Sequence, residues 1–394
     1  MPELTKPAQN ATSPATKVFR ALAAVAIGLV GILVITLASR PGSKDYIEYW
    51  SSAALLVHHA DPYAAAGVYG LETTHGFPAN HPLIMRNPPW ALFLIAPLGF
   101  TTVRVGLLLW TLVAAACILA SAWLLNMPSK DRALAFVFAP ALASICCGQS
   151  SPFLLLGFAL FLRFHRERPF LAGASLLLMA IKPHLFLIFW VVLLAECIYR
   201  RTWLVFAGGA SALVVATAFS MLLDPHIWSQ YLAMMRSSSL ENEFFPTTSM
   251  LFRLAIDRNT VWLLFIPSAV AVVWCLWYFM RHRQAWDWNT HGMLLMMVTI
   301  LVSPYEFFSD EIVLLPSILF ALSLPIRRRH SISVLFAING VALLIIMAGV
   351  QLSSPAYVWT PLAWLAWFLY ATRGSERQSS HSTPIAERAP VRLS

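Results

Sequence analysis

Residues 170–199 read FLAGASLLLMAIKPHLFLIFWVVLLAECIY, two apolar runs separated only by Lys182-Pro183-His184. Each run comes close to the roughly 20 residues that a helix needs to cross about 30 Å of hydrocarbon. Pro183 interrupts helical structure because it lacks an N–H and its ring clashes with the preceding turn. The stretch therefore predicts two transmembrane helices, 170–182 and 184–199, joined by a tight turn that contains a lysine.

The same alternation of apolar runs and short polar breaks extends over most of the chain. Of 394 residues 59% are hydrophobic and only 11% are charged, which is typical of an all-α polytopic membrane protein and not of a soluble domain. We expect about 12 transmembrane helices, within a range of 10–13. The candidates are 18–39, 102–125, 133–147, 152–165, 170–182, 184–199, 203–223, 260–280, 290–303, 311–325, 331–351 and 357–372.

Two segments need separate treatment. The run 18–39 is too long for a removed signal peptide and no cleavage site follows it, so we interpret it as the first span. The segment 88–99 is short and bracketed by prolines, which favours a re-entrant or surface-lying piece over a span.

The basic residues predict the orientation of the spans. With both termini in the cytoplasm, the inner side receives the clusters 6–20, 130–132, 163–168, 200–201, 281–283, 327–329 and 373–392. The outer side keeps only Arg40, Lys44, Arg86, Arg104, Lys182, Arg236, Arg253 and Arg258. Such a bias follows the positive-inside rule, so the net charge of +9 is a topology signal and no nucleic acid partner is expected.

This threading predicts one membrane domain, residues 18–373, between disordered cytoplasmic tails at 1–17 and 374–394. The long outer segments 40–101 and 224–259 are expected to form the active-site face, because long loops between tight spans usually contain functional residues. The five cysteines lie in or at the ends of apolar runs without a CxxC motif, so no disulfide or metal role is expected for them.

The residues just beyond the first span read KDYIEYWSSAALLVHHADPY from Lys44. Tyr46, Tyr49 and Trp50 follow helical spacing, which predicts an amphipathic helix in the membrane interface with its aromatics at headgroup level. Asp45 stands at the N-cap position. Two interpretations stay open for it: a helix cap only, or a general base that accepts a proton from a sugar hydroxyl at the membrane surface.

Four more polar positions fall on the same predicted side. Arg86 is either an interfacial anchor or a phosphate contact, and Gln149 lies in the turn GQSSP as either a cap or a substrate contact. Lys182 is either a snorkelling lysine or a cation for a lipid phosphate, since an ionisable residue inside apolar sequence suggests a functional site. Ser303–Glu311 places Glu306 and Asp310 as either solvated caps or site residues, and no metal-ligand spacing accompanies them.

Six segments together resemble glycosyltransferase family 87. They are KDYIEYWSSAALLVHHADPY, RNPPWALFLIAPLGF, GQSSPFLLLGFAL, RPFLAGASLLLMAIKPHLFLI, PTTSMLFRL and SPYEFFSDEIVLLP, in this order between about 18 and 325. Two positions depart from the family pattern. His184 replaces the glutamine of the usual KPQ, and Ser309 and Asp310 stand where some members have a histidine.

The resemblance implies a GT-C fold with its active site on the extracytoplasmic face of the bacterial inner membrane. It also implies a polyprenyl-phosphate sugar donor, mannose first among the candidates, and a cell-envelope glycolipid or glycan acceptor, with no cofactor and no metal. Asp45 would be the catalytic base of an inverting reaction. The candidate donor-phosphate ligands are Lys182, Arg86 and Lys44, and the candidate substrate contacts are Tyr46, Tyr49, Trp50, Gln149, His184, Glu306 and Asp310.

Two other classes stay open. A transporter or flippase of lipid-linked sugars would also use charged residues and broken helices, but the sequence contains no internal repeat and its polar residues gather on one predicted face. An envelope scaffold protein would tolerate replacement of Asp45 and Lys182.

Overall fold

The computed structural model describes residues 45–125, 134–238, 243–324 and 328–373. Within these ranges every regular element is a helix, either α or 3-10 (η), which confirms the all-α prediction for this part of the chain. The predicted first span 18–39, the predicted tails 1–17 and 374–394 and the candidate ligand Lys44 lie outside the described residues.

Five helices in the described ranges are long and apolar enough to cross a membrane. They are α5 (Val103–Leu124), η4 (Pro183–Phe186) with α11 (Leu187–Arg200), α12 (Trp203–Leu223), η5 (Val261–Phe265) with α15 (Ile266–His282), and α18 (Arg328–Met347). Large apolar side chains point outward from them, among them Leu108, Val214, Val273 and Leu344 at 54–69% exposure. Such surfaces fit contact with lipid, so the protein is a helical membrane protein.

The other predicted spans are shorter helices: α7 (Leu134–Val137), α8 (Ala139–Cys147), α9 (Ser151–Phe164), α10 (Pro169–Met179), α16 (His291–Leu301), η6 (Phe308–Leu314) with α17 (Leu315–Ser323), and α19 (Thr360–Thr372). Prolines contribute to their short lengths: Pro140 separates α8 from α7, and Lys182-Pro183 follow α10. The expected count of about 12 spans is therefore not confirmed.

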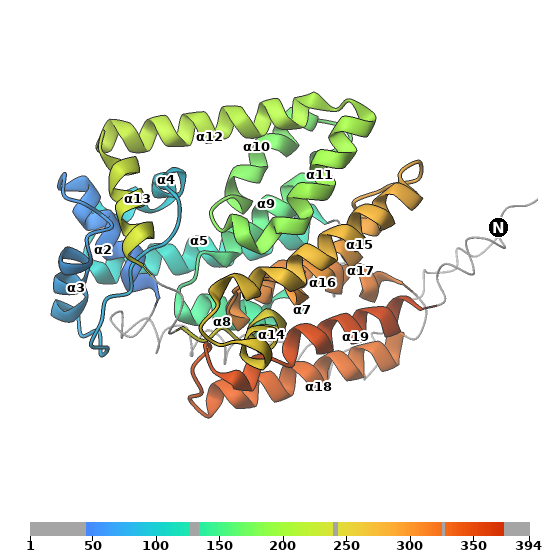
Figure 1. The fold of residues 1–394 in the computed structure, drawn as a ribbon. Helices are drawn as coiled ribbons and strands as arrows, with labels where there is room; N and C mark the ends of the chain where they lie inside the picture. The colour runs from blue at the N-terminus through green and yellow to red at the C-terminus, as the bar shows by residue number, and fades with distance from the viewer. Residues whose placement is uncertain (1–44, 126–133, 239–242, 325–327, 374–394) are drawn as a thin grey trace, which may run out of the picture.

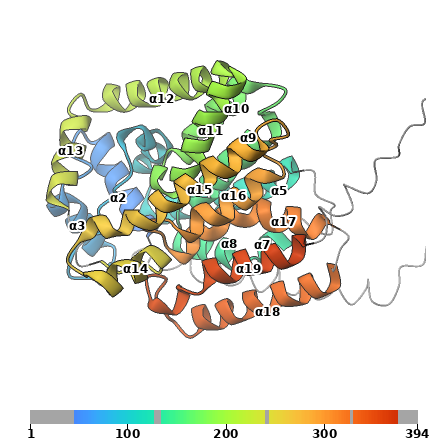
Figure 2. The same cartoon turned by 45° about the vertical axis from the view of Figure 1, so that its right-hand side comes forward.

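The remaining helices are α2 (Tyr46–Val57), α3 (Ala65–Thr74), η2 (Pro89–Ala91), α4 (Leu92–Ile95), η3 (Ala96–Phe100), α13 (Ile227–Ser237), α14 (Thr248–Ile256) and η7 (Pro355–Tyr357). Segment 88–99 is a run of short helical pieces, and its assignment as a re-entrant or surface-lying piece stays a prediction. In Figures 1 and 2, α12 lies along one edge of the molecule and the antiparallel pair α18 and α19 along the opposite edge.

The predicted threading placed certain loops together on one side of the membrane, and the structure brings the same loops together at one end of the helix bundle. At one end Arg166 pairs with Asp287 at 3.0 Å, and Arg200 donates to the Trp286 carbonyl at 2.8 Å. The C-terminal ends of α11, α15 and α19 lie at this end, whereas α2, α3 and α13 lie at the other (Figure 1). Which end faces the cytoplasm stays a prediction.

Helix α2 corrects the expectation of an interfacial helix. Tyr46, Tyr49 and Trp50 are buried, and the Trp50 Nε1 donates to the Thr101 carbonyl at 3.1 Å inside the protein. The helix packs against α3, α5 and η3, where Gly99 lies so close that a Cβ would overlap the Ala53 carbonyl. A helical apolar pattern indicates a covered face, but it does not distinguish a protein neighbour from lipid.

Helix α12 is attached to the bundle mainly through α10, and small residues make this contact possible. A Cβ on Gly208 would overlap the Phe170 carbonyl oxygen, and one on Gly173 would overlap that of Val205. Small residues at such crossings let helix backbones approach closely in membranes. The contact fixes α12, and through its end the Asp224–Ser237 region, relative to the core.

We expect Gly208→Ala to lower the free energy of unfolding by about 1–3 kcal/mol, because the added methyl group forces the two backbones apart. The matched control is Gly70→Ala in α3, where a Cβ meets nothing within 4 Å. That change is expected to be neutral or stabilising by less than about 1 kcal/mol. Thermal unfolding in detergent compares the two, and equal effects would contradict the role of the α10–α12 contact.

Candidate active site

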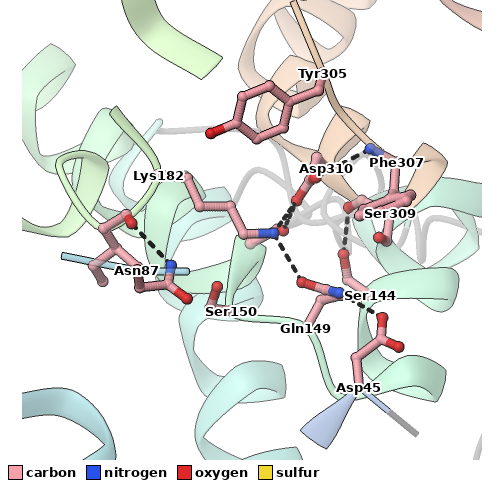
Figure 3. A network of polar contacts seen from close by, with 12 residues as sticks. Asp45, Asn87, Ser144, Gln149, Ser150, Lys182, Tyr305, Phe307, Ser309 and Asp310 are labelled. Carbon is pink, nitrogen blue, oxygen red and sulfur yellow. Dashed lines mark hydrogen bonds and ion pairs between the residues drawn. The ribbon is translucent and has the colours of Figure 1, made fainter. Parts of the chain in front are cut away.

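Four polar side chains from distant parts of the chain form a continuous hydrogen-bonded network. The Lys182 Nζ donates to the Gln149 Oε1 at 2.8 Å and to the Asp310 Oδ1 at 2.7 Å, and the Gln149 Nε2 donates to the Asp45 Oδ2 at 2.5 Å. Figure 3 shows Lys182 between Gln149 and Asp310, with Asp45 beyond Gln149. We call Asp45, Gln149, Lys182 and Asp310 the carboxylate–lysine network. It brings together four of the predicted site residues.

The turn at Gly148 brings the first two members together. Gly148 ends α8 with φ of 70°, in the left-handed region that glycine favours, and a Cβ there would lie 2.6 Å from the Tyr46 Cβ. Tyr46 thus packs directly on the glycine, and the next residue, Gln149, reaches the residue before Tyr46, which is Asp45. The Trp110 Nε1 fixes the turn from α5 by donating to the Gly148 carbonyl at 2.8 Å.

Lys182 and Asp310 form a buried ion pair. Their side chains are 11% and 2% exposed, and they lie 128 residues apart in sequence. Asp310 also accepts from the Ser151 hydroxyl and from the Phe307 backbone N–H at 3.2 Å. Burial alone would raise the pKa of the Asp310 carboxyl, but the Lys182 ammonium and these hydrogen bonds outweigh it and hold the pKa below its ordinary value.

The two carboxylates of the network therefore differ in accessibility. Asp310 is buried and surrounded by protein donors, so it acts as the counterion of Lys182. Asp45 is half-buried, at the N-cap position of α2, and makes no side-chain cap hydrogen bond there. The interpretation of Asp45 as only a helix cap is thus not supported, and Asp45 is the more exposed of the two network carboxylates.

The predicted aromatic contacts divide into two groups. Tyr49 belongs to the site, because its hydroxyl donates to the Gln149 Oε1 at 3.2 Å and lies 3.3 Å from the Ser150 Oγ. The structure does not bring Tyr46 and Trp50 to the network. Tyr46 packs on Trp110 and Gly148, and Trp50 stacks edge-on with His75.

Three further candidates lie beside the network without a hydrogen bond to it. Arg86 forms a bidentate ion pair with Glu243, which joins the two long predicted outer segments. His184 stacks on Tyr305 at 3.8 Å between ring centroids. Glu306 is buried, and neither of its carboxyl oxygens has a hydrogen-bond partner among the described residues.

Glu306 therefore differs from Asp310 in its protonation. Burial raises the pKa of Glu306 well above its ordinary value, and the neighbouring Glu311 and Asp310 carboxyls raise it further. Glu306 is therefore a neutral carboxylic acid enclosed by protein, and it makes no hydrogen bond with Lys182.

Glu48 lies beside the carboxylate–lysine network, and the sequence analysis did not single it out. It lies one helical turn after Asp45, on the same face of α2, and is likewise half-buried. Burial and the Asp45 carboxylate raise the pKa of Glu48 to about 8, although Lys182 and a hydrogen bond with Tyr49 lower it. The spacing of three residues from Asp45 was the available signal.

We expect Glu48 to make the stability of the protein fall as pH rises from about 5 to about 8. In this window the unfolded chain has released the Glu48 proton, whereas the folded chain still holds it, so ionisation favours unfolding. Glu48→Gln removes this dependence. The difference in melting temperature, variant minus wild type, should therefore increase as pH rises. Thermal unfolding across the window tests this, with Glu167→Gln at the opposite end as control, and parallel curves for Glu48→Gln and the wild type would contradict it.

One comparison with known proteins gives a match. A family model described as Glycosyltransferase family 87 matches residues 86–304, more than half of the chain. No curated protein and no solved structure matches the chain. The matched range includes Gln149 and Lys182, while Asp310 lies six residues after its end and Asp45 lies 41 residues before its start.

Proposed function

Because the chain belongs to glycosyltransferase family 87, and is therefore a glycosyltransferase, we propose that it uses a polyprenyl-phosphate sugar as donor. Mannose is the first candidate for the sugar, and a hydroxyl of a cell-envelope glycolipid or glycan is the acceptor. The observation that carries the proposal is the carboxylate–lysine network. It places a half-buried carboxylate and a buried ammonium on the two sides of one amide.

The proposed reaction is a single displacement with inversion. Asp45 accepts the proton of the acceptor hydroxyl while the hydroxyl oxygen attacks the anomeric carbon, and the bond from that carbon to the phosphate oxygen breaks. The products are the new glycoside and polyprenyl phosphate. Phosphate is a good leaving group, so no protein nucleophile is required.

Lys182 is the proposed cation for the departing phosphate. An ammonium has three donor positions, and two of them bind Gln149 and Asp310. The third N–H of the ammonium is left to donate to a phosphate oxygen. A cation fixed at this place lowers the barrier most, because negative charge on the leaving phosphate grows in the transition state. Arg86 is a weaker candidate because Glu243 already occupies its guanidinium, and Lys44 stays a candidate from the sequence only.

The location of the network supports an active site near one membrane surface. Asp45, Gln149, Lys182 and Asp310 all lie in turns or at helix ends, where the predicted threading places the extracytoplasmic side. We propose that the donor enters sideways from the outer leaflet of a bacterial inner membrane. A flippase of lipid-linked sugars is the alternative, since it also needs a phosphate-binding cation.

Reconstitution in liposomes tests the proposal. We expect polyprenyl-phosphate [³H]mannose to transfer label to a glycolipid acceptor and to release one polyprenyl phosphate for each sugar transferred. Movement of intact donor across the bilayer without release would instead establish the flippase. Transfer from nucleotide sugars alone would refute the donor class, and transfer from an arabinofuranose donor alone would change the sugar.

A further inference from the structure

We propose that Gln149 is a positioning residue that fixes the rotation of the Asp45 carboxylate and makes no contact with substrate itself. The inference rests on the proposed role of Asp45 as general base. It assigns Gln149 a task that differs from the substrate contact expected from the sequence. The task follows from the direction of the hydrogen bonds in the carboxylate–lysine network.

Protein groups already occupy the amide oxygen of Gln149 and one of the two N–H groups of its nitrogen. The side chain is buried, its Oε1 accepts from both the Lys182 ammonium and the Tyr49 hydroxyl, and its Nε2 donates to Asp45. A carbonyl oxygen has two lone pairs, so these two donors saturate Oε1. A substrate would have to displace one of them in order to bind there.

The chemistry of its neighbours fixes the orientation of the amide. An ammonium only donates, so the atom that faces Lys182 must be the oxygen. A carboxylate only accepts, so the atom that faces Asp45 must be the nitrogen. The buried pair of Lys182 with Asp310 holds the first link in place, and the amide transmits this constraint to Asp45.

The backbone makes the arrangement stiff. Gly148, with its positive φ, packs against Tyr46 and places Gln149 beside Asp45, and the Trp110 side chain holds the turn from α5. A base must be aligned with the proton that it accepts, and small misplacements cost large factors in rate. Gln149 supplies that alignment, because it lies between Lys182 and Asp45 and its Nε2 holds the Asp45 Oδ2.

Gln149→Glu is the sharpest test, because it keeps the shape and replaces the donor nitrogen with an acceptor oxygen. Two carboxyls would then face each other and share a proton. Among the described residues, the charged and titratable groups around them are Glu48 and Tyr49 on α2, Glu72 on α3, Lys182 after α10, and Asp310 in η6. We expect kcat to fall about 10²-fold with KM unchanged, and the acid limb of the activity profile to move to higher pH.

A matched control exists at the same predicted surface. The Gln230 Nε2 donates to the Asp224 Oδ2 at 2.7 Å, the same kind of contact outside the network. Gln230→Glu should leave kcat, KM and the pH profile unchanged. A rise in KM with an unchanged pH profile for Gln149→Glu would show a substrate contact, and a lowered melting temperature with unchanged kinetics would show a structural role. Either result would overturn the proposal.

A second measurement separates this inference from the proposed function. We expect infrared difference spectra between acid and neutral pH to contain a carboxyl band that Asp45→Asn removes, and this measurement needs no substrate. We expect the midpoint of the band to move to higher pH in Gln149→Glu, and an unchanged midpoint would refute the positioning role. Absence of transfer by the wild type would instead refute the proposed function.

Discussion

Transfer by an Asp45→Asn protein is expected to be about 10² to 10⁴-fold slower than transfer by the wild type, with expression and melting temperature unchanged. Asparagine has the shape of aspartate, and its Oδ1 still accepts from the Gln149 Nε2. The amide does not accept a proton, so the substitution removes the base and preserves the network. The rate is measured with the labelled donor in liposomes.

Asp224→Asn provides the matched control for this experiment. Asp224 is buried and accepts from the Gln230 amide as Asp45 accepts from that of Gln149, but it lies outside the carboxylate–lysine network. We expect full activity from the control. Equal losses in both variants would point to a general effect of the substitution, and full activity of Asp45→Asn would exclude Asp45 as the base. A flat wild-type profile between about pH 4 and pH 8 would argue against it as well.

The sequence predicted the long helices well, because their length follows from hydrophobic thickness. The expected spans 102–125, 203–223 and 260–280 agree within a few residues with Val103–Leu124, Trp203–Leu223 and Val261–His282. The tight turns at Gly148 and Lys182 were also predictable, since glycine and proline interrupt helices for local reasons. These predictions depend on neighbouring residues only.

The sequence did not predict which distant residues meet. Lys182 pairs with Asp310, which lies 128 residues further along the chain, and the sequence around either residue does not identify its partner. The burial of α2 has the same origin, because its apolar face is covered by the protein and not by lipid. Glu48 was passed over for this reason, since it becomes notable only when Asp45 is known to belong to the carboxylate–lysine network.

Replacement of Lys182 by methionine is expected to have the second large effect, on stability and activity together. It leaves the Asp310 carboxylate buried with only Ser151 and the Phe307 N–H as donors. Removal of one partner from a buried ion pair typically costs about 3–5 kcal/mol of folding free energy. We therefore expect a large drop in melting temperature and no detectable transfer.

A double variant separates these two effects. In Lys182→Met with Asp310→Asn, both charges of the buried pair are removed. The asparagine oxygen can accept from the Phe307 N–H, and its NH₂ can donate to the Ser151 hydroxyl oxygen. We expect the melting temperature to recover most of its loss, because replacing both partners avoids an unpaired charge. Transfer should stay at least about 10²-fold below the wild type, as is typical when one transition-state donor is lost.

The kinetic constants of the double variant identify the role of the lysine. A cation that stabilises the departing phosphate acts most strongly in the transition state, so its loss lowers kcat more than it raises KM. A rise in KM alone would mean that Lys182 binds the donor equally in the ground state. Recovery of transfer together with stability would show that the Lys182–Asp310 pair only holds the fold, and the cation for the phosphate would then have to be sought at Arg86.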